Sequence, residues 1–305
     1  MSWDEDRLQR WIWRTSKNSV AVGSPGHDAC VLAAPGGREV LCIDACIEGV
    51  HFEATAAPGR VGHKAAARAL SDLAATAAEP RALLLALTAP RERPEAWLRA
   101  AIGGVRRAGA ECGAALVGGD LSAARGSELQ LVVSALGVLP GRAKPPGRDR
   151  ARPGQRLVLT GPVGGSALGR HLDFCPRLAE GRELFQAGAT AMMDISDGLA
   201  WDLWRLARAS GVRLELDRVP LHKDARRMAR KSGQIALFHG LHDGEDHELV
   251  ASLPRDAPLP AGALEIGRVV EGSGLALSRK LVALLEGGGA ARDWQPHEGG
   301  WRHGE

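Results

Sequence analysis

The chain has 305 residues, of which 45% are hydrophobic and 25% are charged, a balance typical of a globular protein with two domains. Its formal net charge of +3 is too small to predict nucleic-acid binding. The acidic first residues are unlike a secretory signal, and the longest apolar run, 82–89, is too short to span a membrane. Five cysteines without a CxxC pair indicate reduced thiols, so we expect a cytoplasmic protein.

In the first half of the chain, apolar runs bounded by Gly- and Pro-containing turns predict strands, and Ala-rich stretches predict helices. The predicted elements, in chain order, are a short helix from Ser2, strands at 29–33 and 40–44, a helix at 62–78, a strand at 82–88, a helix that begins near Pro94, and strands at 114–117 and 129–139.

Residues 141–154 combine Pro, Gly and charged residues without any periodicity, which is typical of a linker. We therefore expect an N-terminal domain over 1–140 that binds ATP and metal and dimerises, and a C-terminal α/β domain over 155–305. The second region is predicted to contain a strand at 156–160, helices at 164–171, 179–188 and 198–210, and strands at 212–216 and 248–253. Alternating strands and helices predict the α/β fold class.

Aspartates recur where predicted strands begin or end, beside Gly-containing turns, which is where α/β proteins place ligand sites. Carboxylate oxygens are also the ligands that Mg²⁺ prefers. Each aspartate has an ordinary structural alternative as a turn former. Asp72, inside the Ala-rich helix, could pair with Arg68 four residues earlier, and Asp197 could cap the helix that starts at Gly198. The candidate carboxylates are Asp28, Asp44, Asp72, Asp120, Asp194 and Asp197.

The chain lacks a Walker A sequence, because the glycine-rich segment that begins at Gly161 has no lysine to follow it. A protein kinase catalytic loop and a Gly-x-Ser-x-Gly elbow are also missing from the sequence. If the chain handles nucleotides, metal ions must neutralise most of the phosphate charge.

Six short motifs resemble the thiamine-monophosphate kinase family of the aminoimidazole ribonucleotide synthetase-like superfamily. They occur in the order of that family and span residues 20 to 250. The motifs are GHDACV at 26–31, IDACIEGVHF at 43–52, ALSDLAA at 69–75, GGD at 118–120, MDISDGL at 193–199 and GEDHEL at 244–249.

The resemblance implies a two-domain subunit, a homodimer whose N-terminal sheets pair, and ATP with several Mg²⁺ ions in the cleft between domains. It implies phosphoryl transfer to thiamine monophosphate, with no membrane or nucleic-acid partner. By position in the motifs, the six aspartates resemble metal ligands. The residues that resemble ATP contacts are Gly119, Asp120, Arg148 and Ser196, and those that resemble acceptor contacts are His51, Glu245 and Trp301.

This chain departs from the family pattern at His27, Cys42, Ile43 and Leu121, where one carboxylate and three hydroxyls are replaced. An acceptor phosphate is already ionised and needs little help from a general base, so no catalytic histidine or lysine is predicted. Two alternatives remain open from the sequence. One is a superfamily enzyme with another small acceptor, and the other is a nucleotide-binding protein without catalytic activity.

Overall fold

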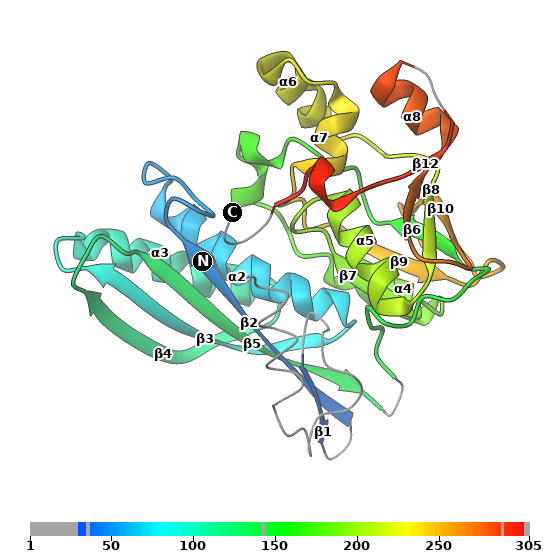
Figure 1. Cartoon of the computed structure of the whole chain (residues 1–305). Helices are drawn as coiled ribbons and strands as arrows, with labels where there is room; N and C mark the ends of the chain where they lie inside the picture. Colours follow the sequence, from blue (N-terminus) through cyan, green and yellow to red (C-terminus); the bar gives the residue numbers. More distant parts are fainter. Residues whose placement is uncertain (1–29, 35–36, 142–143, 288–289, 302–305) are drawn as a thin grey trace.

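The computed structural model describes residues 30–34, 37–141, 144–287 and 290–301 (Figure 1). Two predictions, the short helix from Ser2 and the position of Asp28, lie outside these residues. Among the helices that are described, none has the length and apolar character needed to cross a membrane.

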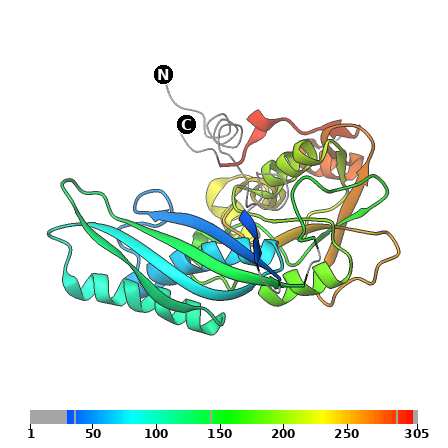
Figure 2. The ribbon, with the colours of Figure 1, turned by 90° about the horizontal axis from the view of Figure 1, so that it is seen from below.

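The first half of the chain forms a five-stranded sheet in the order β1-β2-β5-β3-β4. Neighbouring strands are antiparallel except β3 and β4, which are parallel. Two helices cover one face of this sheet (Figures 1 and 2). The elements are β1 (Cys30–Ala34), β2 (Gly37–Ile47), α2 (Pro58–Ala75), β3 (Glu79–Pro90), α3 (Glu95–Glu111), β4 (Ala115–Ala124) and β5 (Gln130–Pro140).

Small residues let α2 and α3 pack closely against each other. A Cβ added at Gly62 would lie 1.8 Å from the carbonyl oxygen of Ala101, and one added at Gly104 would lie 2.2 Å from the carbonyl oxygen of Gly59. These positions require glycine because the two backbones meet there. The glycines of α2 and α3 therefore set how near the two helices can approach.

The other face of the sheet is left uncovered by the described helices, and it carries exposed apolar side chains. Along β2, Val40 and Cys42 are buried under the helices, while Leu41 and Ile43 alternate with them and are exposed. Ile43 of β2 and Leu84 of β3 both pair with Ser134 of β5, which lies between them in the sheet. Leu84 is therefore on the same face as Ile43, and it is also exposed. We call this surface the open face.

The second half of the chain forms a seven-stranded sheet in the order β12-β11-β8-β10-β6-β9-β7. Only β8 and β11 pair in parallel among its described strands. The elements are β6 (Arg156–Leu159), η1 (Ser166–Leu168), η2 (Arg170–Leu172), α4 (Leu178–Gln186), β7 (Ala191–Asp194), α5 (Leu199–Ser210), β8 (Arg213–Leu216), α6 (Lys223–Ser232), α7 (Ala236–His242), β9 (Leu249–Leu253), β10 (Leu264–Val270), β11 (Gly274–Leu277), α8 (Arg279–Glu286), β12 (Arg292–Asp293) and η3 (Pro296–Glu298).

Helix α2 packs against both halves of the molecule (Figure 1). Its Leu70 and Leu73 belong to one buried cluster with Leu184 of α4, Met192 of β7 and Leu249 of β9. The segment between β5 and β6 is where the sequence predicts a linker. Independent domains at 1–140 and 155–305 stay a prediction, because this hydrophobic core crosses the boundary.

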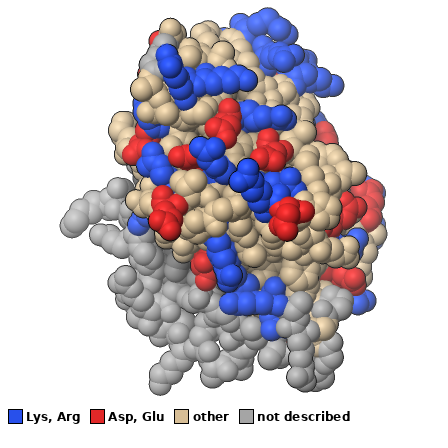
Figure 3. Space-filling view, turned by 90° about the vertical axis from the view of Figure 1, so that its right-hand side faces the viewer, with Lys and Arg blue, Asp and Glu red and all other residues tan. Residues whose placement is uncertain are grey.

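The outer surface of the second half carries Lys and Arg beside Asp and Glu over much of the face in Figure 3. Ion pairs in the second half include Arg213 with Asp293 and Arg268 with Glu215, each with an N–O distance of 2.5 Å. Helix α6 is more strongly basic, and its Arg226 is exposed, as expected for a solvated helix.

The α/β fold class is confirmed, but the predicted helix at 164–171 is wrong. This segment forms the short 3₁₀ turns η1 and η2. Gly164, Gly165 and Gly169 have φ values of 96°, 75° and 118°, which a right-handed α-helix does not allow. The apolar residues of this segment therefore belong to two short 3₁₀ turns and not to one α-helix. The strand predicted at 114–117 also continues through Gly118 and Gly119 to Ala124.

Candidate active site

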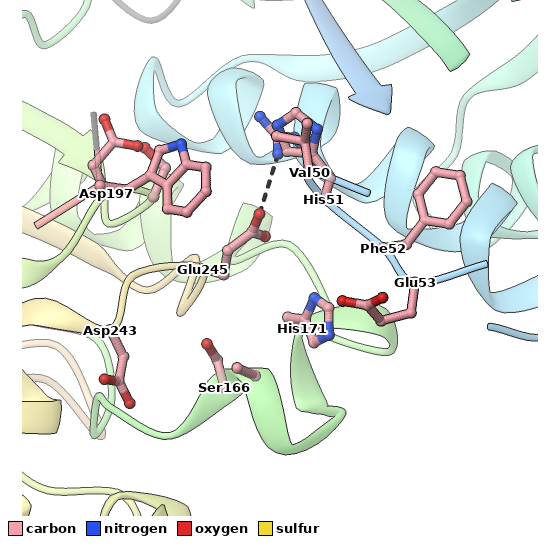
Figure 4. Close-up of a pocket in the computed structure, with 13 residues that line it drawn as sticks. Val50, His51, Phe52, Glu53, Ser166, His171, Asp197, Asp243 and Glu245 are labelled. Atoms are coloured by element: carbon pink, nitrogen blue, oxygen red, sulfur yellow. Dashed lines mark hydrogen bonds and ion pairs between the residues drawn. The ribbon is translucent and has the colours of Figure 1, made fainter. Parts of the chain in front are cut away.

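A cavity of about 240 Å³ opens between the loop that follows β2 and the turns of the second half (Figure 4). Four of its side chains are carboxylates and one is a guanidinium, so the wall has an excess of negative charge. The cavity is lined by Val50, His51, Phe52, Glu53, Arg68, Ser166, Ala167, His171, Ser196, Asp197, Asp243, Glu245 and Trp301.

Glu245 lies at the centre of a charged network on this wall. Its carboxylate accepts from Lys64 Nζ at 2.9 Å and from Arg68 Nη1 at 3.3 Å, both from α2. The other terminal nitrogen of Arg68 donates to Asp44 Oδ1 at 3.0 Å. Burial alone would raise the pKa of Glu245, but the hydrogen bond with His247 and the charges of Arg68 and Lys64 hold it well below its usual range.

His247 extends the network to the end of β7. Its Nε2 lies 3.2 Å from Glu245 Oε2, and its Nδ1 lies 3.0 Å from Asp194 Oδ2. Asp194 Oδ2 also accepts from the hydroxyl of Ser71 at 2.7 Å. Burial opposes the charge of His247, but the two carboxylates outweigh it and raise its pKa to about 9. Phe174 stacks on the imidazole at a centroid distance of 4.0 Å.

The backbone that carries Glu245 and His247 is unusual. Both residues have left-handed conformations, with φ values of 54° and 49°. Their amides donate to the carbonyl oxygens of Ser196 at 2.7 Å and Ile195 at 2.8 Å. Such conformations cost free energy in residues with a side chain, and they persist where the surrounding structure enforces them, often at functional sites.

The turn after β7 brings Ser196 and Asp197 to the cavity. The carboxylate of Asp202 accepts from both of their amides at 3.0 Å, and this contact fixes the turn. Asp197 Oδ2 accepts from Arg205 at 2.5 Å, while its carbonyl oxygen accepts from the amide of Trp301 at 2.9 Å. The alternative prediction that Asp197 caps the next helix is wrong, because the N-cap residue is Gly198 and no side chain caps it.

Comparison with known proteins places this arrangement in a family. The sequence family described as AIR synthase related protein, N-terminal domain, matches residues 26–139. The thiamine-monophosphate kinase of Mycobacterium tuberculosis is 37% identical over 289 residues, which cover 88% of this chain and 84% of the relative. This chain belongs to the thiamine-monophosphate kinase family.

Further relatives agree with this assignment. The thiamine-monophosphate kinase of Corynebacterium glutamicum is 36% identical over 272 residues, or 81% of each chain. The solved structure described as "AaThiL complexed with AMPPCP and TMP" is 28% identical, covers 98% of this chain and 97% of its own, and has a TM-score of 0.85. The predicted family and the predicted fold are therefore confirmed.

The structure brings some of the predicted metal ligands near the cavity and separates others. Asp44, Asp194 and Asp197 belong to the networks described above, and Asp72 follows Ser71 on α2. The alternative pairing of Asp72 with Arg68 is not seen, because Arg68 directs its terminal nitrogens to Asp44 and Glu245. Within the described residues, no three His, Cys, Asp or Glu side chains form a ready metal site.

Asp120 lies apart from Asp44. The strand register pairs Asp120 with Ala86 on the open face, whereas Asp44 pairs with Val133 on the face under the helices. Asp120 is exposed, and its carboxylate accepts from the hydroxyl of Ser122 at 2.8 Å. The two carboxylates of one chain therefore lie on opposite sides of the sheet.

The remaining predicted nucleotide contacts have defined local roles. A Cβ at Gly119 would lie 1.8 Å from the carbonyl oxygen of Leu85, so this strand position requires glycine. Arg148 accepts a hydrogen bond from Ser210 through its carbonyl oxygen at 2.7 Å. Burial would raise the pKa of Asp194, but His247 and Ser71 outweigh burial and lower it. The charge of Arg148 makes a smaller contribution in the same direction.

Sequence reasoning missed four basic residues of the site: Lys64, Arg68, His171 and His247. Lys64 and Arg68 are four residues apart in an Ala-rich helix, and this spacing of two cations on one helix face was the available signal. His171 had no such signal, because it was assigned to a helix that does not form.

Proposed function

We propose that this chain transfers the terminal phosphoryl group of ATP to thiamine monophosphate and gives thiamine diphosphate. The observation that carries the proposal is the network from Asp44 through Arg68 to Glu245, which joins a carboxylate of β2 to the wall of the acidic cavity. The relatives support it, because they are named thiamine-monophosphate kinases and one was solved with AMPPCP and TMP.

The cavity suits the acceptor in charge. Thiamine monophosphate carries a positive thiazolium ring, and carboxylates such as Glu53 and Asp243 favour a cation in this cavity. Trp301 adds an aromatic face of the kind that attracts organic cations. His51 and Glu245 line the same cavity as Trp301, and we assign all three to acceptor binding.

We propose that several Mg²⁺ ions accompany ATP on Asp44, Asp72, Asp194 and Asp197, with Asp28 and the Asp120 of a second copy as further ligands. These carboxylates fit the ion, because Mg²⁺ usually takes one or two carboxylates and completes its shell with phosphate oxygens and water. Bound Mg²⁺ would screen the repulsion between the two phosphorylated substrates. Arg68 and Arg205 hold Asp44 and Asp197 in defined positions for that purpose.

We propose further that ATP is contacted by Gly119, Asp120, Arg148 and Ser196. Two copies of the chain would pair through the open face. Leu41, Ile43 and Leu84 support the pairing, because exposed apolar side chains gathered on one face mark interaction surfaces. Pairing would bury Ile43, which is 67% exposed, and would place Asp120 at the seam between copies. The protein would act in the cytoplasm, in keeping with Cys42, Cys46, Cys112 and Cys175, which form no disulfide.

The test incubates purified protein with ATP, Mg²⁺ and a panel of acceptors: thiamine monophosphate, thiamine and pyridoxal phosphate. Thiamine diphosphate and ADP, resolved by chromatography, should form in equal amounts with thiamine monophosphate alone. EDTA should abolish both products. Formation of ADP that does not depend on thiamine monophosphate, or a faster reaction with another acceptor, would refute the assignment.

A further inference from the structure

His171 is a cavity residue to which the proposed function gives no role. It lies in the short turn η2 and is half-buried. Figure 4 shows its ring at the edge of the cavity, in this view between Ser166 and Glu53. Its Nδ1 is directed at Lys64 of α2, with an Nζ–Nδ1 distance of 2.7 Å.

Lys64 settles which nitrogen of His171 carries the proton. The Lys64 side chain is 0% exposed, and its Nζ lies 2.5 Å from the carbonyl oxygen of His51 and 2.9 Å from Glu245 Oε2. An ammonium group has three protons and no lone pair, so it can donate to these two oxygens and to one further acceptor. Burial lowers the pKa of Lys64, but the carboxylate of Glu245 at 2.9 Å opposes this and favours the charged ammonium form. With two of its protons directed at oxygens, the ammonium donates the third to His171 Nδ1.

The imidazole of His171 is consequently neutral, with its proton on Nε2. Burial, and then the charge of Lys64, lower the pKa of His171 to about 4, so the ring does not become charged at neutral pH. A free neutral imidazole exchanges between two tautomers, whereas this one is fixed by its partner. The cavity therefore gains an uncharged N–H donor among carboxylates.

We propose that His171 is a specificity-determining residue that donates its Nε2–H to an uncharged ring nitrogen of the acceptor. This inference rests on the proposed function, because thiamine monophosphate has an aminopyrimidine ring with two such nitrogens. For His171 a phosphate is the poorer partner, since the carboxylates of Glu53 and Asp243 line the same cavity and repel anions. A site that donates to a substrate atom discriminates against analogues without that atom.

The first test compares thiamine monophosphate with an analogue in which a methylphenyl ring replaces the aminopyrimidine. His171→Phe removes the donor, and His171→Gln is the matched control, because its amide can donate from a similar position. For His171→Phe we expect the KM for thiamine monophosphate to rise about tenfold, as for the loss of one neutral hydrogen bond. The KM for ATP should stay unchanged, and the preference over the analogue should disappear. His171→Gln should retain that preference.

The outcomes separate this inference from the proposed function. If His171→Phe still prefers thiamine monophosphate as strongly as the parent does, the inference is wrong while the kinase assignment stands. If the parent binds thiamine monophosphate in a calorimetric titration but does not phosphorylate it, the kinase assignment fails. The ratio of the dissociation constants of parent and His171→Phe for thiamine monophosphate then decides the role of His171. A parent that does not bind thiamine monophosphate overturns both.

The second test observes the tautomer directly in protein labelled with ¹⁵N-histidine. The His171 signals are assigned by their loss in His171→Gln. At pH 7 we expect a protonated Nε2 and an unprotonated Nδ1, and in Lys64→Met a mixture of both tautomers. A parent spectrum with the proton of His171 on Nδ1, or with a charged ring, would overturn the proposal even if Lys64→Met does not fold.

Discussion

His247 is held between two carboxylates, and this position makes the stability of the protein depend on pH. The side chain is 2% exposed and contacts Asp194 at 3.0 Å and Glu245 at 3.2 Å. Its pKa is raised to about 9 in the folded protein, while the unfolded chain has the ordinary value near 6.5. The folded state therefore binds this proton more tightly than the unfolded state does.

The rise of the His247 pKa from 6.5 to about 9 corresponds to about 3 kcal/mol of unfolding free energy. The sign follows from linkage. The whole contribution is present below pH 6.5, it declines as the pH rises above that value, and it is lost once the pH passes about 9. The protein should thus lose stability across a range in which an ordinary surface histidine has little effect.

The measurement is urea unfolding between pH 6 and pH 10 in EDTA, on the parent and on His247→Gln. The difference in unfolding free energy between the two proteins should shrink by about 3 kcal/mol over this range. Cys46, whose pKa burial raises to about 12, titrates in both proteins, so its contribution cancels in the difference. A difference that stays constant from pH 6 to pH 10 would refute the charged bridge.

Three further predictions concern the site, the open face and the helix pair. Asp44→Asn should lower turnover by at least roughly 10²-fold, because it removes a carboxylate charge from the proposed metal site, whereas the exposed Asp293→Asn should stay within about twofold; similar losses in both would contradict the role of Asp44. Light scattering should give twice the 32.2 kDa chain mass, and Ile43→Asp should give the single-chain mass; a parent that scatters as one chain would exclude pairing. Gly62→Ala should cost about 2 kcal/mol or more in urea unfolding, because its Cβ would meet the backbone of α3, while Gly103→Ala, with a flexible side chain 3.4 Å away, should be neutral or stabilising; equal effects would contradict the close packing.

Much of the fold and part of the candidate site could be predicted from the sequence, because the signals were local. Alternating apolar residues in β2 and the Ala-rich stretch of α2 each depend on neighbours a few positions away. The motif that contains Asp194 and Asp197 likewise occupies one strand and the following turn. Each of these features depends only on residues close together in the sequence, so the sequence alone was enough to predict them.

Other parts of the site depend on contacts between distant residues. Lys64 meets His171 across 107 positions of the chain, and Ser71 meets Asp194 across 123. No periodicity encodes such a pair. The position of Asp120 on the open face could not be read from its motif either, because it depends on how β3 and β4 are paired.

Helix α2 also restricts how the protein can move. A two-domain enzyme commonly closes on its substrates by hinge rotation, in which each domain keeps its own core intact. Here Leu70 and Leu73 pack in one core with residues of β7 and β9, and a Cβ at Gly181 of α4 would lie 2.3 Å from the carbonyl oxygen of Ala74. Swinging the halves apart would expose this shared core to water. Rotation of one half against the other is therefore unfavourable in this protein, because it would break a core that both halves share.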